Sequence, residues 1–286
     1  MKFGDLEIFV VSDGRFRLDG GAMFGVVPKV LWQKRLAADD RNRVTLGLNC
    51  LLIRSAKHTL VVETGTGDKG DAKWNDIYGI DHSVTLLDSL ARRGVAPEDV
   101  DIVVNTHLHF DHCGWNTRRD RDGKPVPTFS RARYFVQRGE YEHAREPTER
   151  DRVSYRKENL QPLAESGQWV WVEGDQEIAP GIELVRTPGH TRDLQCVRLT
   201  SRGRTAFFFA DLVPTTAHLS YAWIMGYDLY PLTTLEQKKH WIPEAVDNEW
   251  LCFFAHDPET PAAYLRERDG QVVAEPVQEP ELVATE

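Results

Sequence analysis

The chain has 286 residues, of which 41% are hydrophobic and 28% charged, and its formal net charge is −9. This length allows one large domain or two small ones, and the acidic balance argues against nucleic acid or an anionic membrane as the main partner. No apolar run reaches the roughly 18 residues of a membrane-spanning helix, and the N-terminus lacks a signal-peptide core. We therefore expect a cytoplasmic enzyme.

The N-terminal region predicts strands, turns and one unusual loop. Residues 5–12 have the pattern of a strand, and residues 12–15 that of a turn into a second strand. Residues 20–36 are apolar but interrupted by glycines and a proline, which indicates a loop rather than a regular element. This loop either packs on the core or forms a flap over an active site. In the second case Met23 and Phe24 are candidate substrate contacts.

A hairpin and a helix precede the most informative part of the chain. The apolar runs 45–54 and 58–63 are separated by three turn residues, which predicts a β-hairpin. Residues 83–93 have apolar side chains at helical spacing and end at Gly94, a residue that commonly stops a helix. Residues 100–104 are apolar and mostly β-branched, which predicts a buried strand.

The segment after that strand gives the strongest functional signal. Residues 107–112 read His-Leu-His-Phe-Asp-His, so three imidazoles and a carboxylate lie within six residues. Such side chains are seldom all buried without partners, and a metal ion is the natural partner. His107 and His109 are two apart where an extended chain ends, so they point the same way. Gly114 permits the turn that brings Asp111 and His112 round to them.

Three later strands each lead to another potential metal ligand. Residues 182–185 precede His190, residues 207–210 precede Asp211, and residues 251–255 precede His256. Ligands at the strand ends of a rigid sheet converge on one edge, which is how open sheets usually build sites.

An aromatic stretch follows Asp211 and predicts a substrate pocket, with core packing as the alternative. Within residues 212–232, the candidate substrate contacts are His218, Tyr221, Trp223 and Tyr227. Residues 233–246 are predicted to form a helix opened by Thr233 or Thr234. The acidic tail, residues 275–286, contains prolines and is expected to be frayed.

Taken in order, these motifs resemble those of the metallo-β-lactamase superfamily. The resemblance rests on Glu63-Thr64-Gly65, the H-x-H-x-D-H run, Gly189-His190, Ala210-Asp211 and Ala255-His256, and it spans residues 60–256. It implies an α/β fold, the four-layer αββα sandwich, with residues 1–286 as a single domain. One departure is Glu63, which stands where the family usually has Asp, so its support of the ligands is open.

The resemblance also implies a two-metal site. His107, His109 and His190 would hold one ion, Asp111, His112 and His256 the second, and Asp211 would bridge them. We expect zinc, although iron, manganese and cobalt also suit imidazole and carboxylate ligands. A hydroxide held between the ions would be the nucleophile. Asp111 and Asp211 are the candidate catalytic carboxylates.

The resemblance is strongest to N-acyl homoserine lactonases, the quorum-quenching enzymes, and to methyl parathion hydrolase. We therefore expect a lactonase or esterase acting on a small-molecule lactone or ester, with a homodimer left open. Lactonases of this type place a tyrosine where this chain has Pro214, so either Tyr221 or Tyr227 substitutes for it or the leaving group is protonated in another way, for example by Asp111. The alternatives are a phosphotriester or aryl-ester hydrolase and, in a different class, an iron-dependent persulfide dioxygenase.

Overall fold

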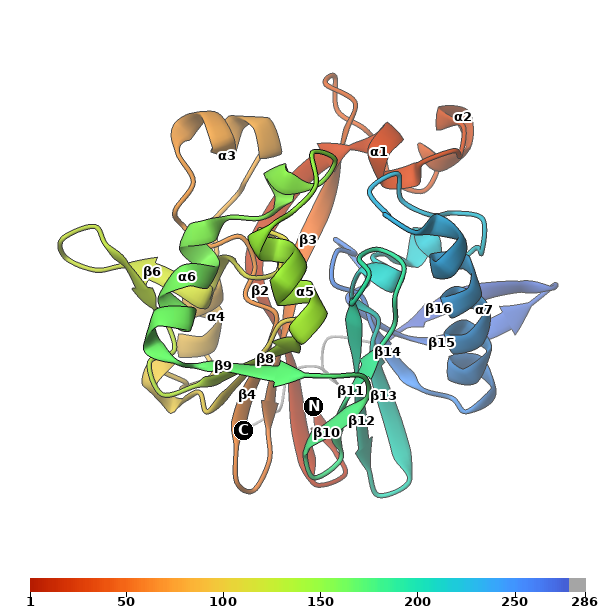
Figure 1. The fold of residues 1–286 in the computed structure, drawn as a ribbon. Helices are drawn as coiled ribbons and strands as arrows, with labels where there is room; N and C mark the ends of the chain where they lie inside the picture. The colour runs from red at the N-terminus through yellow and green to blue at the C-terminus, as the bar shows by residue number, and fades with distance from the viewer. Residues whose placement is uncertain (278–286) are drawn as a thin grey trace. The chain divides into compact units, whose positions relative to one another are not determined.

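The predicted hairpin and the strand before the His-rich run lie in one seven-stranded sheet (Figure 1). The computed structural model describes residues 1–277. The strands, in spatial order, are β1 (Lys2–Phe3), β2 (Leu6–Asp19), β3 (Arg43–Arg54), β4 (Thr59–Val62), β5 (Ile102–Val104), β8 (Arg133–Gln137) and β9 (Trp169–Val172). β3 pairs antiparallel with β4, which confirms the hairpin. β5 pairs in parallel with both β4 and β8, which suits its fully apolar, β-branched sequence.

Contacts divide the chain into two units. The first unit comprises Met1–Gly14 and Leu48–Glu173, and the second comprises Arg15–Gly47 and the described chain from Gly174 onward. β2 and β3 each pass from one unit into the other. The H-x-H-x-D-H run belongs to the first unit, whereas His190, Asp211 and His256 belong to the second.

The helices of the first unit are α3 (Ala72–Tyr78), α4 (Leu86–Ala91), α5 (Arg138–Arg145) and α6 (Lys157–Ser166), with 3₁₀ turns at Pro97–Asp99, Gly114–Asn116 and Arg152–Ser154. α4, α5 and α6 bury apolar side chains with those of the sheet, whereas no residue of α3 is buried. A two-stranded sheet is formed by β6 (Thr117–Arg119) and β7 (Pro125–Pro127). α4 confirms the predicted helix, and Leu86 and Leu90 of α4 join the core that contains Val61 of β4 and Val103 of β5.

The second unit contains a second seven-stranded sheet. Its strands, in spatial order, are β10 (Gln176–Ala179), β11 (Ile182–Arg186), β12 (Gln195–Ser201), β13 (Arg204–Phe208), β14 (Leu251–Phe253), β15 (Ala262–Arg268) and β16 (Gln271–Pro276). The helical elements are α1 (Gly20–Phe24), α2 (Lys29–Trp32) and α7 (Pro231–Asp247), with 3₁₀ turns at Ala210–Leu212 and Thr216–His218. These elements confirm the predicted α/β class.

Three local predictions were wrong. The chain makes no turn into a second strand at residues 12–15, because β2 continues through Gly14, whose φ of +86° few other residues adopt. Residues 20–36 contain two short helices instead of only loop, and the Asp19 side chain caps α1 by accepting from the Ala22 N–H. α7 begins at Pro231 rather than at Thr233 or Thr234, because proline fits the first helical position.

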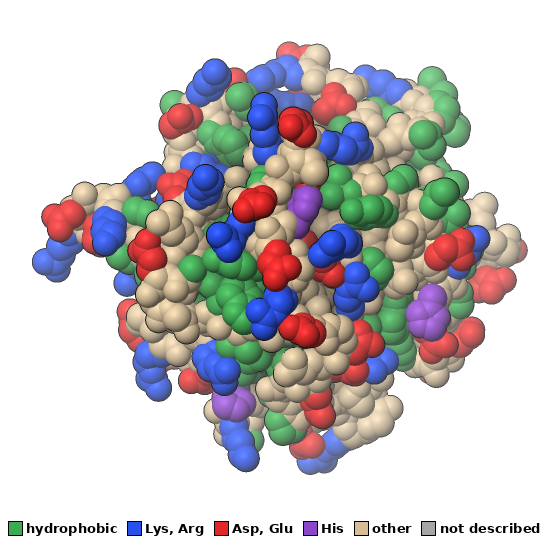
Figure 2. Space-filling model, viewed as in Figure 1, with side chains coloured by type: hydrophobic (Ala, Val, Ile, Leu, Met, Phe, Trp, Pro, Cys, Tyr) green, Lys and Arg blue, Asp and Glu red, His purple; other side chains and the backbone are tan. Residues whose placement is uncertain are grey.

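On the face drawn in Figure 2, acidic and basic side chains are interspersed. None of the helices within residues 1–277 has the length and apolarity needed to cross a membrane. The acidic tail predicted from residue 275 lies partly in β16, and from residue 278 it lies outside the described residues.

Candidate metal centre

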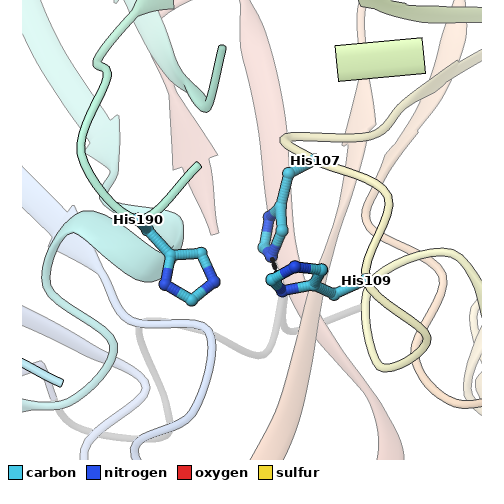
Figure 3. A group of neighbouring side chains, drawn as sticks. All are labelled: His107, His109 and His190. Carbon is cyan, nitrogen blue, oxygen red and sulfur yellow. Dashed lines mark hydrogen bonds between the residues drawn. The ribbon is translucent and has the colours of Figure 1, made fainter. Parts of the chain in front are cut away.

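The side chains of the H-x-H-x-D-H run are buried and lie close together. His107 Nε2 and His109 Nδ1 are 3.1 Å apart (Figure 3). The ring centroids of His107 and His112 are 4.0 Å apart, and His112 Nε2 is 3.7 Å from Asp111 Oδ2. Ring nitrogens and a carboxylate oxygen therefore gather at the end of β5, as the sequence predicts.

The backbone of this run is folded by a turn and a close glycine contact. The N–H groups of His112 and Cys113 both donate to the His109 carbonyl, at 3.0 and 3.2 Å. A Cβ atom on Gly114 would lie 1.9 Å from the Thr66 carbonyl carbon, so no other residue fits there. The turn therefore lies at residues 109–113, and Gly114 is needed for its close contact with Thr66 rather than for the turn itself.

Glu63, which stands where the family usually has Asp, lies close to two of these histidines. Its Oε1 accepts from the Thr106 N–H at 3.1 Å, and its Oε2 is 3.6 Å from His112 Nδ1. Ligand atoms of Glu63, His107 and His112 all lie within 4.8 Å of one another. Burial raises the pKa of Glu63, and the neighbouring His112 partly offsets this. The Glu63 side chain thus lies beside Nδ1 of His112, whereas Asp111 lies beside Nε2.

The second unit presents two histidines to one carboxylate. His190 Nε2 is 3.2 Å from Asp211 Oδ2, and His256 Nε2 is 3.2 Å from Asp211 Oδ1. His190, also labelled in Figure 3, lies on the loop after β11, while Asp211 and His256 follow β13 and β14. All three side chains are buried.

The other ring nitrogen of each histidine in this group has its own acceptor. His256 Nδ1 is 2.9 Å from the Gly47 carbonyl oxygen, and His190 Nδ1 is 2.9 Å from Asp228 Oδ1. Because a carbonyl oxygen only accepts, Nδ1 of His256 carries a hydrogen, and Nε2 is the ring nitrogen that faces Asp211. An unprotonated ring nitrogen and a carboxylate oxygen 3.2 Å apart repel each other unless a proton or a cation lies between them. Imidazole and carboxylate donors of this kind suit a divalent metal ion.

The candidate substrate contacts in residues 20–36 and the buried part of 212–232 pack against one another. Met23, Phe24 and His218 are all buried. The Phe24 ring stacks on His218 at a centroid distance of 4.8 Å, and His218 Nε2 is 2.9 Å from the Met23 carbonyl oxygen. Burial lowers the pKa of His218 to about 3, so this imidazole is neutral at physiological pH. In the described structure these three residues contact other side chains of the second unit rather than open space.

The other three candidate substrate contacts are more exposed. Tyr221 and Trp223 line a cavity of about 650 Å³ within the second unit, which the β15–β16 hairpin also borders. Tyr221 is 38% exposed, and Tyr227 is half-buried. Trp223 also packs edge-on against Phe24, with ring centroids 5.6 Å apart, so it links the cavity to the packed residues.

An aromatic cluster beside the ligand run was missed by the sequence reasoning. Trp74 and Tyr78 of α3 lie 4.9 and 4.7 Å from the ring of Phe110, which stands between His109 and Asp111 in the chain. Their own rings are 4.5 Å apart, and both side chains are half-buried. The available signal was a Trp and a Tyr four residues apart, preceded by an Asp that caps the helix.

Comparisons with known proteins identify the family of this chain. The family model described as "Metallo-beta-lactamase superfamily" matches residues 44–262. An N-acyl homoserine lactonase from Bacillus cereus is 31% identical over 163 residues, which are 52% of this chain and 57% of that relative. The chain thus spans little more than half the length of this curated relative.

Solved structures extend the likeness over nearly the whole chain. The crystal structure of a probable metal-dependent hydrolase from Staphylococcus aureus is 32% identical, with a TM-score of 0.90, and covers 98% of this chain and 99% of its own. The dizinc quorum-quenching lactonase AidC has a TM-score of 0.80 over 97% of this chain and 96% of its own, at 19% identity, and so shows the fold alone. These matches confirm the family and fold class predicted from sequence, and the chain belongs to the metallo-β-lactamase superfamily.

Proposed function

We propose that this protein is a metal-dependent hydrolase that binds two divalent ions and opens a lactone or cleaves an ester, with N-acyl homoserine lactones as the first substrates to test. The observation that carries the proposal is the arrangement around Asp211. Each of its carboxylate oxygens faces the Nε2 atom of a different buried histidine at 3.2 Å. Family membership and the relative named as an N-acyl homoserine lactonase support the reaction class.

The proposed ligands are those expected from the sequence. His107, His109 and His190 would hold one ion, Asp111, His112 and His256 would hold the other, and Asp211 would contribute to both. Zinc is the proposed metal, in keeping with AidC being described as a dizinc enzyme. When bound, the two ions would lower the pKa of water towards neutrality and polarise the bond to be cleaved.

The protein's own residues have two proposed duties. Glu63 and Asp228 hold the imidazoles of His112 and His190 in fixed orientations, from 3.6 and 2.9 Å. Asp111 would take the proton released by the attacking water and pass it to the leaving oxygen, a duty that Pro214 cannot perform.

The substrate class is proposed from the side chains around the ligand run. The half-buried rings of Trp74 and Tyr78 pack on the buried ring of Phe110, which lies between His109 and Asp111 in the chain. Such an aromatic surface favours the acyl or aryl part of an uncharged substrate over a polyanion. A phosphotriester would use the same features, so relative rates must separate it from a lactone.

Metal content and initial rates on one preparation test the proposal. The full chain, purified without chelator, is analysed by mass spectrometry for metals and assayed on an acyl homoserine lactone, a simple lactone and a phosphotriester. We expect about two metals per chain and metal-dependent turnover that is fastest on a lactone. About one iron per chain, with oxygen consumption on a persulfide and no hydrolysis, would overturn the proposal in favour of a dioxygenase.

A further inference from the structure

His190 is held by a carboxylate far along the chain. Its Nδ1 is 2.9 Å from Oδ1 of Asp228, and both side chains are buried. The second oxygen of Asp228 accepts a hydrogen bond from the Thr234 hydroxyl at 2.6 Å. Thr234 lies in the first turn of α7 and is also buried. The three residues form a chain of hydrogen bonds from α7 to His190.

The backbone locks the same two segments together. The Leu229 N–H donates to the His190 carbonyl at 3.0 Å, and the Tyr230 N–H donates to the Gly189 carbonyl at 2.9 Å. A Cβ atom on Gly189 would lie 2.4 Å from Thr234 Oγ1 and 2.8 Å from Thr234 Cα, so only glycine allows this approach. The close fit leaves Asp228 and His190 little freedom to separate.

The hydrogen bond determines which ring nitrogen of His190 is available. The carboxylate oxygen of Asp228 accepts, so Nδ1 of His190 carries the hydrogen of this contact, and Nε2 is the ring nitrogen that faces Asp211, 3.2 Å away. His256 is oriented in the same sense by the Gly47 carbonyl, a neutral backbone group. A carboxylate makes the imidazole a stronger electron donor than a carbonyl does, so His190 is the more strongly supported of the two.

We propose that Asp228, itself oriented by Thr234, is a positioning residue that fixes the tautomer and ring orientation of His190 and strengthens its binding of a metal ion. The inference rests on the proposed function, because it takes His190 as a metal ligand. Asp228, from the loop before α7, and Thr234, from α7 itself, would thus act through His190 without contacting substrate.

Four variants of the full chain test the inference. Asp228→Asn keeps the shape but removes the charge, and Thr234→Val removes the hydroxyl that orients the carboxylate. Thr233→Val makes the same chemical change at the preceding, half-buried residue and serves as the matched control. His190→Ala tests whether His190 binds metal at all.

The first readout is the affinity for Co²⁺ and Zn²⁺, measured by competition with a chromophoric chelator. Losing a carboxylate that supports a ligating histidine typically weakens metal binding by about 10- to 100-fold. We expect a loss of this size for one ion in Asp228→Asn, a smaller loss in Thr234→Val and none in Thr233→Val. Asp228→Asn binding both ions as tightly as the wild type would overturn the inference.

The second readout needs no metal. Long-range ¹H–¹⁵N NMR spectra of the metal-free protein distinguish protonated from unprotonated ring nitrogens. We expect His190 to be protonated at Nδ1 in the wild type and to populate both tautomers in Asp228→Asn. An unchanged tautomer in that variant would also overturn the inference. If His190→Ala leaves metal binding intact, the proposed ligand set fails instead, and the NMR result still decides whether Asp228 controls the tautomer.

Discussion

Replacement of Asp13 by asparagine should destabilise the protein strongly, because this buried carboxylate joins three separate segments of the first unit. Its Oδ2 accepts from the backbone N–H groups of Thr66 and Gly67, at 2.8 and 3.1 Å. Its Oδ1 accepts from the Leu86 N–H at 2.8 Å and from the Trp115 indole N–H at 2.6 Å. The turn after β4, the start of α4 and the segment after the ligand run thus meet at one side chain.

The magnitude follows from the number of donors. An asparagine amide has one oxygen, so in either orientation its NH₂ group faces two of the four N–H donors. A buried N–H without an acceptor costs about 1–3 kcal/mol, which gives roughly 2–6 kcal/mol for two. Burial raises the pKa of Asp13, so removal of its charge relieves part of that cost. We therefore expect the free energy of unfolding to fall by roughly 2–4 kcal/mol.

Equilibrium urea unfolding measures this loss, with tryptophan fluorescence and circular dichroism recorded on the same samples to check that the transitions coincide. Asp122→Asn is the matched control, because Asp122 is exposed, and we expect a change within about 0.5 kcal/mol. A loss below about 1 kcal/mol in Asp13→Asn, comparable to the control, would refute the reasoning that the four N–H groups depend on this carboxylate.

Three further predictions concern pH, substrate and metal. Burial lowers the pKa of Lys238 to about 7 from an ordinary 10.5, while its ammonium group donates to the carbonyls of Ser220 and Trp223 at 2.7 and 2.8 Å. Between pH 7 and 10.5, Lys238 is protonated in the unfolded chain but not in the folded one. Its contribution to the free energy of unfolding therefore rises by up to about 1.4 kcal/mol per pH unit. Lys238→Met should lose that slope in urea titrations at pH 7.5 and 9.5, and an identical slope would contradict it. Trp74→Ala should lower kcat/KM for a long-chain acyl lactone by about 5- to 30-fold, equivalent to about 1–2 kcal/mol, and spare a short-chain one. Equal losses in Ile77→Ala, on the same helix, would argue against a specific contact. Dialysis against a chelator should abolish hydrolysis and lower the melting temperature, and zinc should restore both; hydrolysis that survives full metal removal would exclude the proposed chemistry.

The potential ligands could be found from sequence because each follows a strand with a local pattern. Val103 and Val104 are β-branched and apolar, and the His-rich run begins three residues later. The strand predicts where the chain stops being extended, and alternation then predicts that His107 and His109 share a face. Asp211 and His256 follow β13 and β14 in the same way. These signals are local, because each candidate ligand lies within a few residues of the strand that precedes it.

The groups that support these ligands have no local signal. Asp228 is 38 residues beyond His190, and the carbonyl that holds His256 belongs to Gly47, 209 residues earlier. Their pairing depends on tertiary structure alone, and no periodicity encodes it. Thr234 illustrates the ambiguity, because a threonine near the start of a helix is expected to cap it. Here its hydroxyl donates to Asp228 instead, and α7 begins three residues earlier.

Aromatic residues are the least predictable part of the candidate site, because the same side chains suit a core and a substrate pocket. His218 shows what decides between the two. Both of its ring nitrogens are engaged, Nδ1 with the Thr215 hydroxyl at 2.8 Å and Nε2 with the Met23 carbonyl at 2.9 Å, and its face is covered by Phe24. Through these contacts His218 links α1 to the segment that follows β13. Tyr221 is exposed and lines a cavity, so its side chain is accessible to a ligand.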